Sequence, residues 1–368
     1  MAADRIHESS AILARELRHK SVPPFKSAIP VNDSAIQCRS CHAQPTAEAT
    51  ADSLGSVLIF ARSRYYWSPA RVIRILWGVL TNIPEQFELL RIMRFPAFAD
   101  FLRTDPRFRF KFLIRDYLVR DFSTAQRTAC FLHHYKRLHA SMSGDLLHRV
   151  LHRRVTVLEA LRDDIQIEIN LCFSRPFEKE GELSLNLHVD GAVVFVLSFT
   201  IVPGWVTQSE AEEVILISRL QGTNGYYPQI RAATKALHDV GPAALLLAAL
   251  HGFAKAFSIG RMAGVSAIRQ SSYTEELSLF YKNAYDDFFS EIGVSKNASG
   301  FFLSSIPPED KPISSIKQGH KIRTKEKRQF KRQVAEVVCL LLRQQMSGTD
   351  SGPSCRDEPI QIVNLVDS

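Results

Sequence analysis

The sequence lacks an apolar run long enough to cross a membrane. The best candidate, residues 243–259, is about one helical turn shorter than the roughly 20 residues that a bilayer requires, and it carries His251 and Lys255. We therefore expect a buried helix there. The first residues also lack the apolar core of a secretory signal peptide. Together these two absences predict a cytoplasmic protein.

Cysteines are few and mostly scattered, which argues against a disulfide framework and favours a reducing compartment. Two of them form Cys38-Arg-Ser-Cys41-His42, which matches the attachment pattern of a c-type haem. No export signal accompanies the pattern and its flanks are poor in apolar residues, so we expect no haem. Zinc would need a fourth ligand, which is not evident nearby. The other interpretation is an ordinary pair of surface cysteines.

A complete set of metal ligands is also lacking further along the chain. His148 and His152 are four residues apart and share a helix face, but no Asp or Glu at a matching spacing completes a site. Ordinary surface histidines and a packed, hydrogen-bonded His134 explain the local cluster better than a metal site does. We predict no metal site.

Acidic residues are nearly absent from residues 311–333, where Glu326 is accompanied by nine lysines and arginines. Nine minus one equals the net charge of +8 of the whole chain, so the remainder is close to neutral. Such a segment either forms the solvated face of a helix or binds an anionic surface. Only Phe330 interrupts the basic run with an aromatic ring, so base stacking is poorly supported and sequence-specific nucleic-acid binding is not expected.

The periodicity of apolar residues changes from helical to alternating along the chain. Residues 1–55 are poor in large apolar side chains, and residues 56–160 follow a helical pattern with a capping box at Ser123-Thr-Ala-Gln126. Alternation then predicts strands at 165–173, 183–189, 193–201 and 214–220, with Asp190-Gly191 as a hairpin turn.

The second half returns to helices and ends with strands. We predict helices over 229–238 and 243–259, a strand over 262–268, a partly helical stretch over 275–292 and a last strand over 300–306. N-terminal helices therefore precede an antiparallel meander and a β-α-β arrangement, which defines an α+β fold class.

Several short sequence motifs, in a fixed order, resemble those of the VirK/YbjX family of bacterial proteins. They span roughly residues 110–342 and are His134-Tyr135, Gly181-Glu182-Leu183-Ser184-Leu185, Leu197-Ser198-Phe199, Arg219-Leu220-Gln221-Gly222, Thr234-Lys235-Ala236-Leu237-His238, Tyr285-Asp286-Asp287-Phe288-Phe289 and Lys327-Arg328-Gln329-Phe330-Lys331-Arg332. The resemblance implies links to virulence, to the cell envelope and to resistance against antimicrobial peptides. One departure is Asp239-Val-Gly-Pro-Ala243, which lacks the basic pair that the family carries there.

The order of elements also resembles that of GNAT-type N-acyltransferases. The resemblance places Arg219-Leu-Gln221-Gly222-Thr223-Asn-Gly225 where those enzymes bind the pyrophosphate of acyl-coenzyme A, with the second glycine one position late. It also implies that the strand before this turn splays from its parallel neighbour to admit the pantetheine arm. A carboxylate would accept the proton of the incoming amine. Candidates for that role are Glu168 and Asp286, with Tyr281 or Tyr285 as an acid.

Two hypotheses remain open at this point. In the first, the glycine turn holds acyl-coenzyme A, and the partners are an acyl donor and an amine substrate. In the second, the turn is only a tight corner, and the chain is a non-catalytic regulatory protein whose basic segment binds nucleic acid or an anionic membrane. The predicted organisation is a weakly ordered tail (1–55), a helical region (56–160), a GNAT-like core (161–310), a basic C-terminal helix (311–346) and a disordered tail (347–368).

Overall fold

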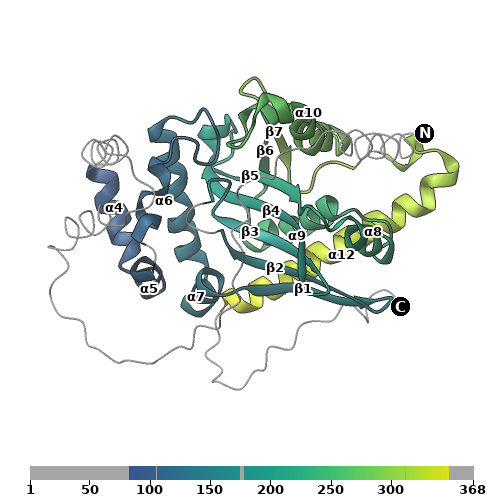
Figure 1. Cartoon of the computed structure of the whole chain (residues 1–368), viewed down its shortest axis with the longest axis horizontal. Helices are drawn as coiled ribbons and strands as arrows, with labels where there is room; N and C mark the ends of the chain where they lie inside the picture. The colour runs from purple at the N-terminus through teal and green to yellow at the C-terminus, as the bar shows by residue number, and fades with distance from the viewer. Residues whose placement is uncertain (1–82, 105, 175–177, 311, 348–368) are drawn as a thin grey trace, which may run out of the picture. The chain divides into compact units, whose positions relative to one another are not determined.

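Helices come first in the part of the chain that the computed structural model describes, which is residues 83–104, 106–174, 178–310 and 312–347 (Figure 1). The first five elements are α4 (Ile83–Met93), α5 (Pro96–Thr104), η1 (Pro106–Leu113), α6 (Thr124–Ser141) and α7 (Gly144–His152). The expectations for residues 1–55, for Cys38, Cys41 and His42, and for nearly all of residues 347–368 concern positions outside the described residues.

The capping box predicted at the start of the longest of these helices is confirmed. The hydroxyl of Ser123 accepts a hydrogen bond from the N–H of Gln126, and the Gln126 side chain accepts one from the N–H of Ser123. These reciprocal bonds satisfy two donors that a helix start otherwise leaves free. The helix α6 that begins here packs against strand β4 and carries the buried His134 and Tyr135.

A seven-stranded sheet follows, with the strands side by side in chain order. The strands are β1 (Val155–Arg162), β2 (Ile165–Phe173), β3 (Leu183–Val189), β4 (Ala192–Pro203), β5 (Glu213–Gly222), β6 (Arg261–Val265) and β7 (Phe301–Ser305). Every neighbouring pair is antiparallel except β5 and β6, which are parallel. The connection between these two strands contains α8 (Tyr227–Ala236) and α9 (Pro242–Ala256).

The predicted meander is confirmed, but the sequence prediction missed its first strand. β1 lies across the boundary that we set at residues 160 and 161, so the helical region ends earlier than predicted. Its Leu158, Glu159 and Ala160 are good helix formers, and pairing with β2 overrides that local preference. The hairpin at Asp190-Gly191 is confirmed, since both residues have positive φ angles, as the tight turn requires.

The two faces of the sheet differ in polarity. On β3, Leu183, Leu185 and Leu187 alternate with Ser184 and Asn186. The leucine face lies under α9, because Phe199 pairs with Leu183 in the register and its ring packs on Phe253 of α9. The opposite face carries polar side chains, which is unusual for side chains that are mostly buried.

Helix α12 (Lys321–Met346) packs against α9 and completes this layer (Figure 1). The two backbones approach so closely at Gly252 that a Cβ atom there would lie 2.4 Å from the carbonyl oxygen of Ala335. The basic C-terminal helix begins at Lys321 rather than at residue 311, and Val334, Val337 and Val338 are among its buried residues. No helix among the described residues combines the length and the apolar character that a membrane span requires.

Candidate functional site

A row of polar side chains crosses four strands on the face of the sheet opposite α9. Cys172 of β2 pairs with Ser184 of β3, Ser184 pairs with Ser198 of β4, and Ser198 pairs with Arg219 of β5. Asn186 donates a hydrogen bond from its amide to the sulfur of Cys172 over 3.0 Å. Burial raises the pKa of the Cys172 thiol. The thiol is therefore protonated and unreactive. Of the residues in this row, Arg219 rather than Cys172 is the candidate for a functional role.

The sheet changes its geometry at the end of this row. β5 and β6 pair over only three positions, from Ile215 with Met262 to Ile217 with Gly264. Ser218 is the extra residue of a β-bulge opposite β4, because Ser198 pairs with Arg219 and Phe199 with Ile217. A bulge bends its strand. Beyond Ile217 the carboxyl end of β5 continues without a partner on the β6 side.

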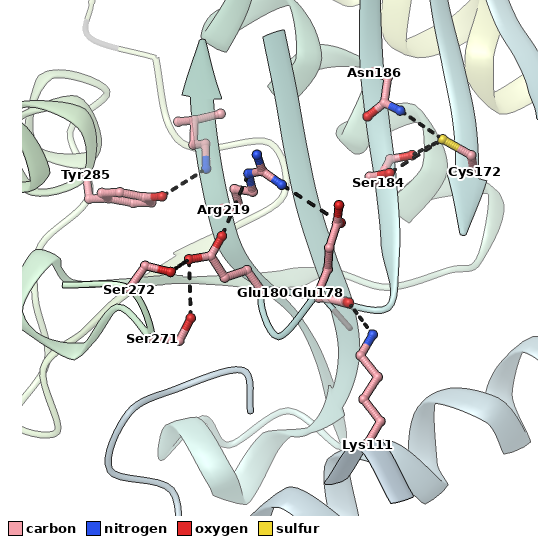
Figure 2. Close-up of polar contacts among 12 residues, drawn as sticks. Lys111, Cys172, Glu178, Glu180, Ser184, Asn186, Arg219, Ser271, Ser272 and Tyr285 are labelled. Atoms are coloured by element: carbon pink, nitrogen blue, oxygen red, sulfur yellow. Dashed lines mark hydrogen bonds and ion pairs between the residues drawn. The ribbon is translucent and has the colours of Figure 1, made fainter. Parts of the chain in front are cut away.

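Arg219 points toward two carboxylates, those of Glu178 and Glu180 (Figure 2). One oxygen of Glu180 lies 3.7 Å from its Nε atom, and one oxygen of Glu178 lies 3.8 Å from its Nη1 atom. Both separations are longer than a hydrogen bond. The Arg219 side chain is 28% exposed and that of Glu180 is 13% exposed, so the pair is accessible without being fully solvated.

The second wall of this site comes from the segment between β6 and β7. The hydroxyls of Ser271 and Ser272 donate to the other oxygen of Glu180 over 3.2 Å and 2.6 Å. Next to them lie α10 (Ser278–Tyr281) and the π-helical segment η5 (Lys282–Asp287). Short π segments in helices occur often at functional sites.

Two tyrosines from that segment stack in parallel beside β5, with ring centroids 5.9 Å apart. Tyr281 donates its hydroxyl to the carbonyl oxygen of Ser272, and Tyr285 accepts a hydrogen bond from the N–H of Leu220 over 3.3 Å (Figure 2). Burial raises the pKa of both phenols above the ordinary value. Tyr285 thus fills part of the space where β5 lacks a strand partner and keeps its proton.

The predicted phosphate turn is exposed at the end of β5. Gln221 and Gly222 are still paired with β4, and the N–H of Thr223 donates to the carbonyl oxygen of Val194. Among the described hydrogen bonds, none uses the N–H of Asn224 or Gly225, and Gly225 has a φ of +89°. The turn therefore offers fewer free amides than the motif implied, and they lie on its second half.

The two predicted carboxylate bases lie apart from each other. Glu168 is on β2, three strands from β5, and binds the side-chain amides of Gln166 and Asn170. Both oxygens of Asp286 are engaged, one by the N–H of Ala267 over 2.8 Å and the other by Lys296 over 3.0 Å. The structure brings Tyr281, Tyr285 and Arg219 together with Glu180, which the sequence prediction did not select.

A signal for Glu180 was present in the sequence. Glu178, Glu180 and Glu182 alternate with other residues just before β3, a spacing that places all three acids on the same side of an extended segment. In the structure Glu178 and Glu180 face Arg219, whereas Glu182 is buried against Lys111 at 2.9 Å. The spacing alone therefore did not predict that Glu178 and Glu180 share a surface while Glu182 does not, because this depends on the local path of the chain before β3.

The histidines that suggested metal binding lie elsewhere. His148 and His152 stack with ring centroids 4.5 Å apart, and His152 contacts the carbonyl oxygen of Ala97 over 3.1 Å. His134 is buried and accepts the N–H of Ile201 through Nδ1. Within the described ranges, no three His, Cys, Asp or Glu side chains are grouped as metal ligands.

The fold and this site define a class: an α+β protein whose single parallel strand pair opens beside an Arg–Glu–Tyr cluster. The family described as "Protein of unknown function (DUF535)" matches residues 75–335. The chain belongs to this family, which is also the VirK/YbjX family that its motifs resemble. No curated protein and no solved structure matches the chain.

Proposed function

We propose that this protein transfers an acyl group from an acyl-coenzyme A thioester to an amine, at the point where β5 and β6 diverge. The observation that carries the proposal is the parallel pair that stops after Ile217 and Gly264, at a bulge, next to a turn with free amides. Together with the preceding meander, this order of elements supports a GNAT-like arrangement of the core.

An extended ligand with amide groups suits this edge of β5. Amides along a strand alternate in direction, so the N–H of Gly222 points to the same side as that of Leu220, toward the space beside β6. The pantetheine arm carries amides that can pair with such an edge as an added strand does. The free N–H groups of Asn224 and Gly225 would then bind the pyrophosphate.

The transfer itself needs a proton acceptor and an oxyanion donor. The amine nitrogen attacks the thioester carbonyl and a C–N bond forms; the C–S bond then breaks, and the leaving thiolate takes up the proton that the nitrogen has lost, so the products are an amide and the free thiol. We assign the acceptor role for the amine proton to Glu180, which lies at the divergence and is partly exposed. A backbone N–H of β5 would stabilise the oxyanion. In this proposal Glu168 is too far along the sheet to act, and Asp286 anchors the loop after β6.

The proposal extends to the setting that the family resemblance implies. Acylation removes the positive charge of an amine, and a surface rich in charged groups responds to such a change in its binding of cationic peptides. We therefore propose that the protein acts in the cytoplasm and that its activity is linked to the cell envelope, to virulence and to resistance against antimicrobial peptides.

Calorimetric titration of the full chain with coenzyme A and acetyl-coenzyme A tests the proposal. We expect saturable binding of both ligands. Gly222→Asp should abolish it, because the new carboxylate repels the phosphates and its Cβ already lies 3.4 Å from the Phe195 ring. Gly319→Asp is the matched control, since that position has open space around it and lies far along the chain. Absence of heat at millimolar ligand in the unchanged protein would refute the proposal.

One observation favours a second function, which is binding to an anionic membrane surface. Ile322 is 74% exposed at the start of α12, between Lys321 and Arg323. An exposed apolar residue among cations is typical of contact with a charged bilayer. Sedimentation with vesicles of phosphatidylglycerol and phosphatidylcholine should capture the protein, and Ile322→Ser should weaken capture. Equal recovery with pure phosphatidylcholine vesicles, or with the variant, would exclude this function, and a gel shift with RNA would separate it from nucleic-acid binding.

A further inference from the structure

A groove of about 1000 Å³ lies on the α9 side of the sheet, between α9, α12 and the segment that follows β7. Its floor is apolar and consists of Ala244, Leu247, Ala248, Ile259, Ile292 and Ile306. Near β6 and β7 the groove is lined by the residues that precede β6 and by those that follow β7. The divergence of β5 and β6 lies at the other, carboxyl ends of these two strands. The groove is therefore separate from the proposed transfer site.

A histidine with one ring nitrogen that has no hydrogen bond among the described residues lines this groove. His251 of α9 lines it, and its Nε2 atom is buried and has no hydrogen bond among the described residues. Burial and, secondly, the charge of Lys331 lower the pKa of His251 to about 4. The imidazole is thus neutral near pH 7, and one ring nitrogen is available to donate. A buried polar atom without a partner costs free energy, which a ligand would recover.

Lys331 of α12 is a spare cation beside that histidine. Its ammonium has no hydrogen bond or ion pair within the described part of the chain, and its side chain is half-buried. The neighbouring cations differ. Arg328 and Arg332 bind Asp310, Lys255 binds Glu336 over 2.5 Å, and Lys327 donates to the carbonyl oxygen of Asp239. Two acids on the facing wall, Glu291 and Glu309, are exposed at the rim.

We propose that this groove binds an amphiphilic anion, with a phosphate or carboxylate head between His251 and Lys331 and an aliphatic chain along the apolar floor. The head would receive one neutral N–H donor and one ammonium, which is a charge-assisted pair. The floor would remove the chain from water. Neither a free inorganic ion nor an uncharged chain uses both halves of the groove.

Titration calorimetry of the full-length protein with alkyl phosphates below their micelle concentration tests the proposal. Octyl phosphate should bind in a 1:1 complex, and hexyl phosphate more weakly by about fourfold for each methylene removed. Inorganic phosphate and octanol each supply one half of the ligand, and both should bind at least about tenfold more weakly than octyl phosphate. The titrations with inorganic phosphate and with octanol distinguish a site for an amphiphilic anion from a site that binds only phosphate or only apolar chains.

Variants identify the head-group contacts. Lys331→Met should weaken octyl phosphate binding about tenfold or more, and His251→Phe should weaken it to a smaller extent. Lys325→Met is the matched control, because it removes the same charge from an exposed position of α12 outside the groove, and it should bind like the unchanged protein. Equal affinities of the Lys331→Met and Lys325→Met variants, no dependence on chain length, or no saturable binding at millimolar octyl phosphate would each overturn the proposal.

Discussion

Two acidic clusters occupy one short segment before β3 and differ in what surrounds them. Glu182 turns into the protein, where the ammonium of Lys111 lies 2.9 Å away, both side chains are 0% exposed and the hydroxyl of Tyr135 donates to the same carboxylate. Glu180 turns outward to Arg219 at 3.7 Å. The first cluster joins η1 and α6 to the sheet, whereas in the second no described carboxylate lies within hydrogen-bonding distance of the Arg219 guanidinium.

Burial and the completeness of the charge pair distinguish a structural polar cluster from one that is available for chemistry. A buried charge pair must be complete, because removing one partner leaves a charge that the interior cannot solvate. A pair that is partly open to solvent and has long separations contributes less stability and can exchange its partner for a ligand. Substitutions should therefore divide into those that unfold the protein and those that leave it folded and change only its binding or activity.

The largest effect is expected for Lys111→Met. The variant leaves Glu182 buried without its counterion and should lower the free energy of unfolding by about 3–5 kcal/mol. Urea unfolding followed by circular dichroism measures it. Lys179→Met is the control from the same neighbourhood, because the Lys179–Asp116 pair is 40% and 32% exposed and should contribute less than about 1 kcal/mol. A loss below that value for Lys111→Met would contradict the structural assignment of the buried cluster.

Acidification should destabilise the buried region through His134, which neighbours Tyr135. Burial, with smaller contributions from His133 and Lys111, lowers the His134 pKa well below its usual value. The unfolded chain therefore binds a proton below pH 6.5 that the folded chain does not bind, so stability is present at pH 7 and falls as the pH decreases. The contribution lost by pH 5 is about 2 kcal/mol.

Urea unfolding at pH 7, 6 and 5 checks this expectation. His134→Asn keeps an acceptor for the N–H of Ile201 and removes the titration, so it should flatten the pH dependence by the same amount. His148→Asn, at an exposed position, should leave the dependence unchanged. An identical pH profile for His134→Asn and the unchanged protein would show that His134 does not titrate differently on folding.

A smaller effect on stability is expected for Tyr285→Phe, which tests the hydrogen bond between Tyr285 and the edge of β5. The variant leaves the N–H of Leu220 without its acceptor, at a cost of about 1–2 kcal/mol. Tyr273→Phe removes an exposed hydroxyl that contacts Glu275 and should be close to neutral. Equal thermal midpoints for these two variants would mean that the Leu220 N–H finds another partner, and the edge of β5 would then be more adaptable than described.

The smallest effect on stability, below about 1 kcal/mol, is expected for Glu180→Gln. If Glu180 accepts the amine proton, the same variant should slow thiol release from acetyl-coenzyme A with an amine acceptor by about 100-fold or more. The isosteric amide keeps the contacts with Ser271 and Ser272. Unchanged turnover would remove Glu180 from the proposed reaction, while loss of folding would assign it to the structural class with Glu182.

Local patterns predicted most of the strands but not the partners of the polar residues. Alternation located β2 and β3 to the residue, and the two positive φ angles at Asp190 and Gly191 follow from the hairpin signal. β1 was missed because its composition favours a helix and its pairing with β2 is a tertiary effect. Glu180 was missed for a related reason, since its proximity to Arg219 depends on the path of the chain between β2 and β3.

The close contact at Gly252 also has a consequence for the order in which the chain can fold. Helix α9 lies between the sheet and α12, so one of its sides stays uncovered until α12 has been synthesised. Before α12 is made, the chain would therefore expose the apolar side of α9, and transiently exposed apolar surface is prone to aggregation. α12 therefore completes the packing of α9, and a variant truncated before residue 321 should expose that side of α9 and aggregate.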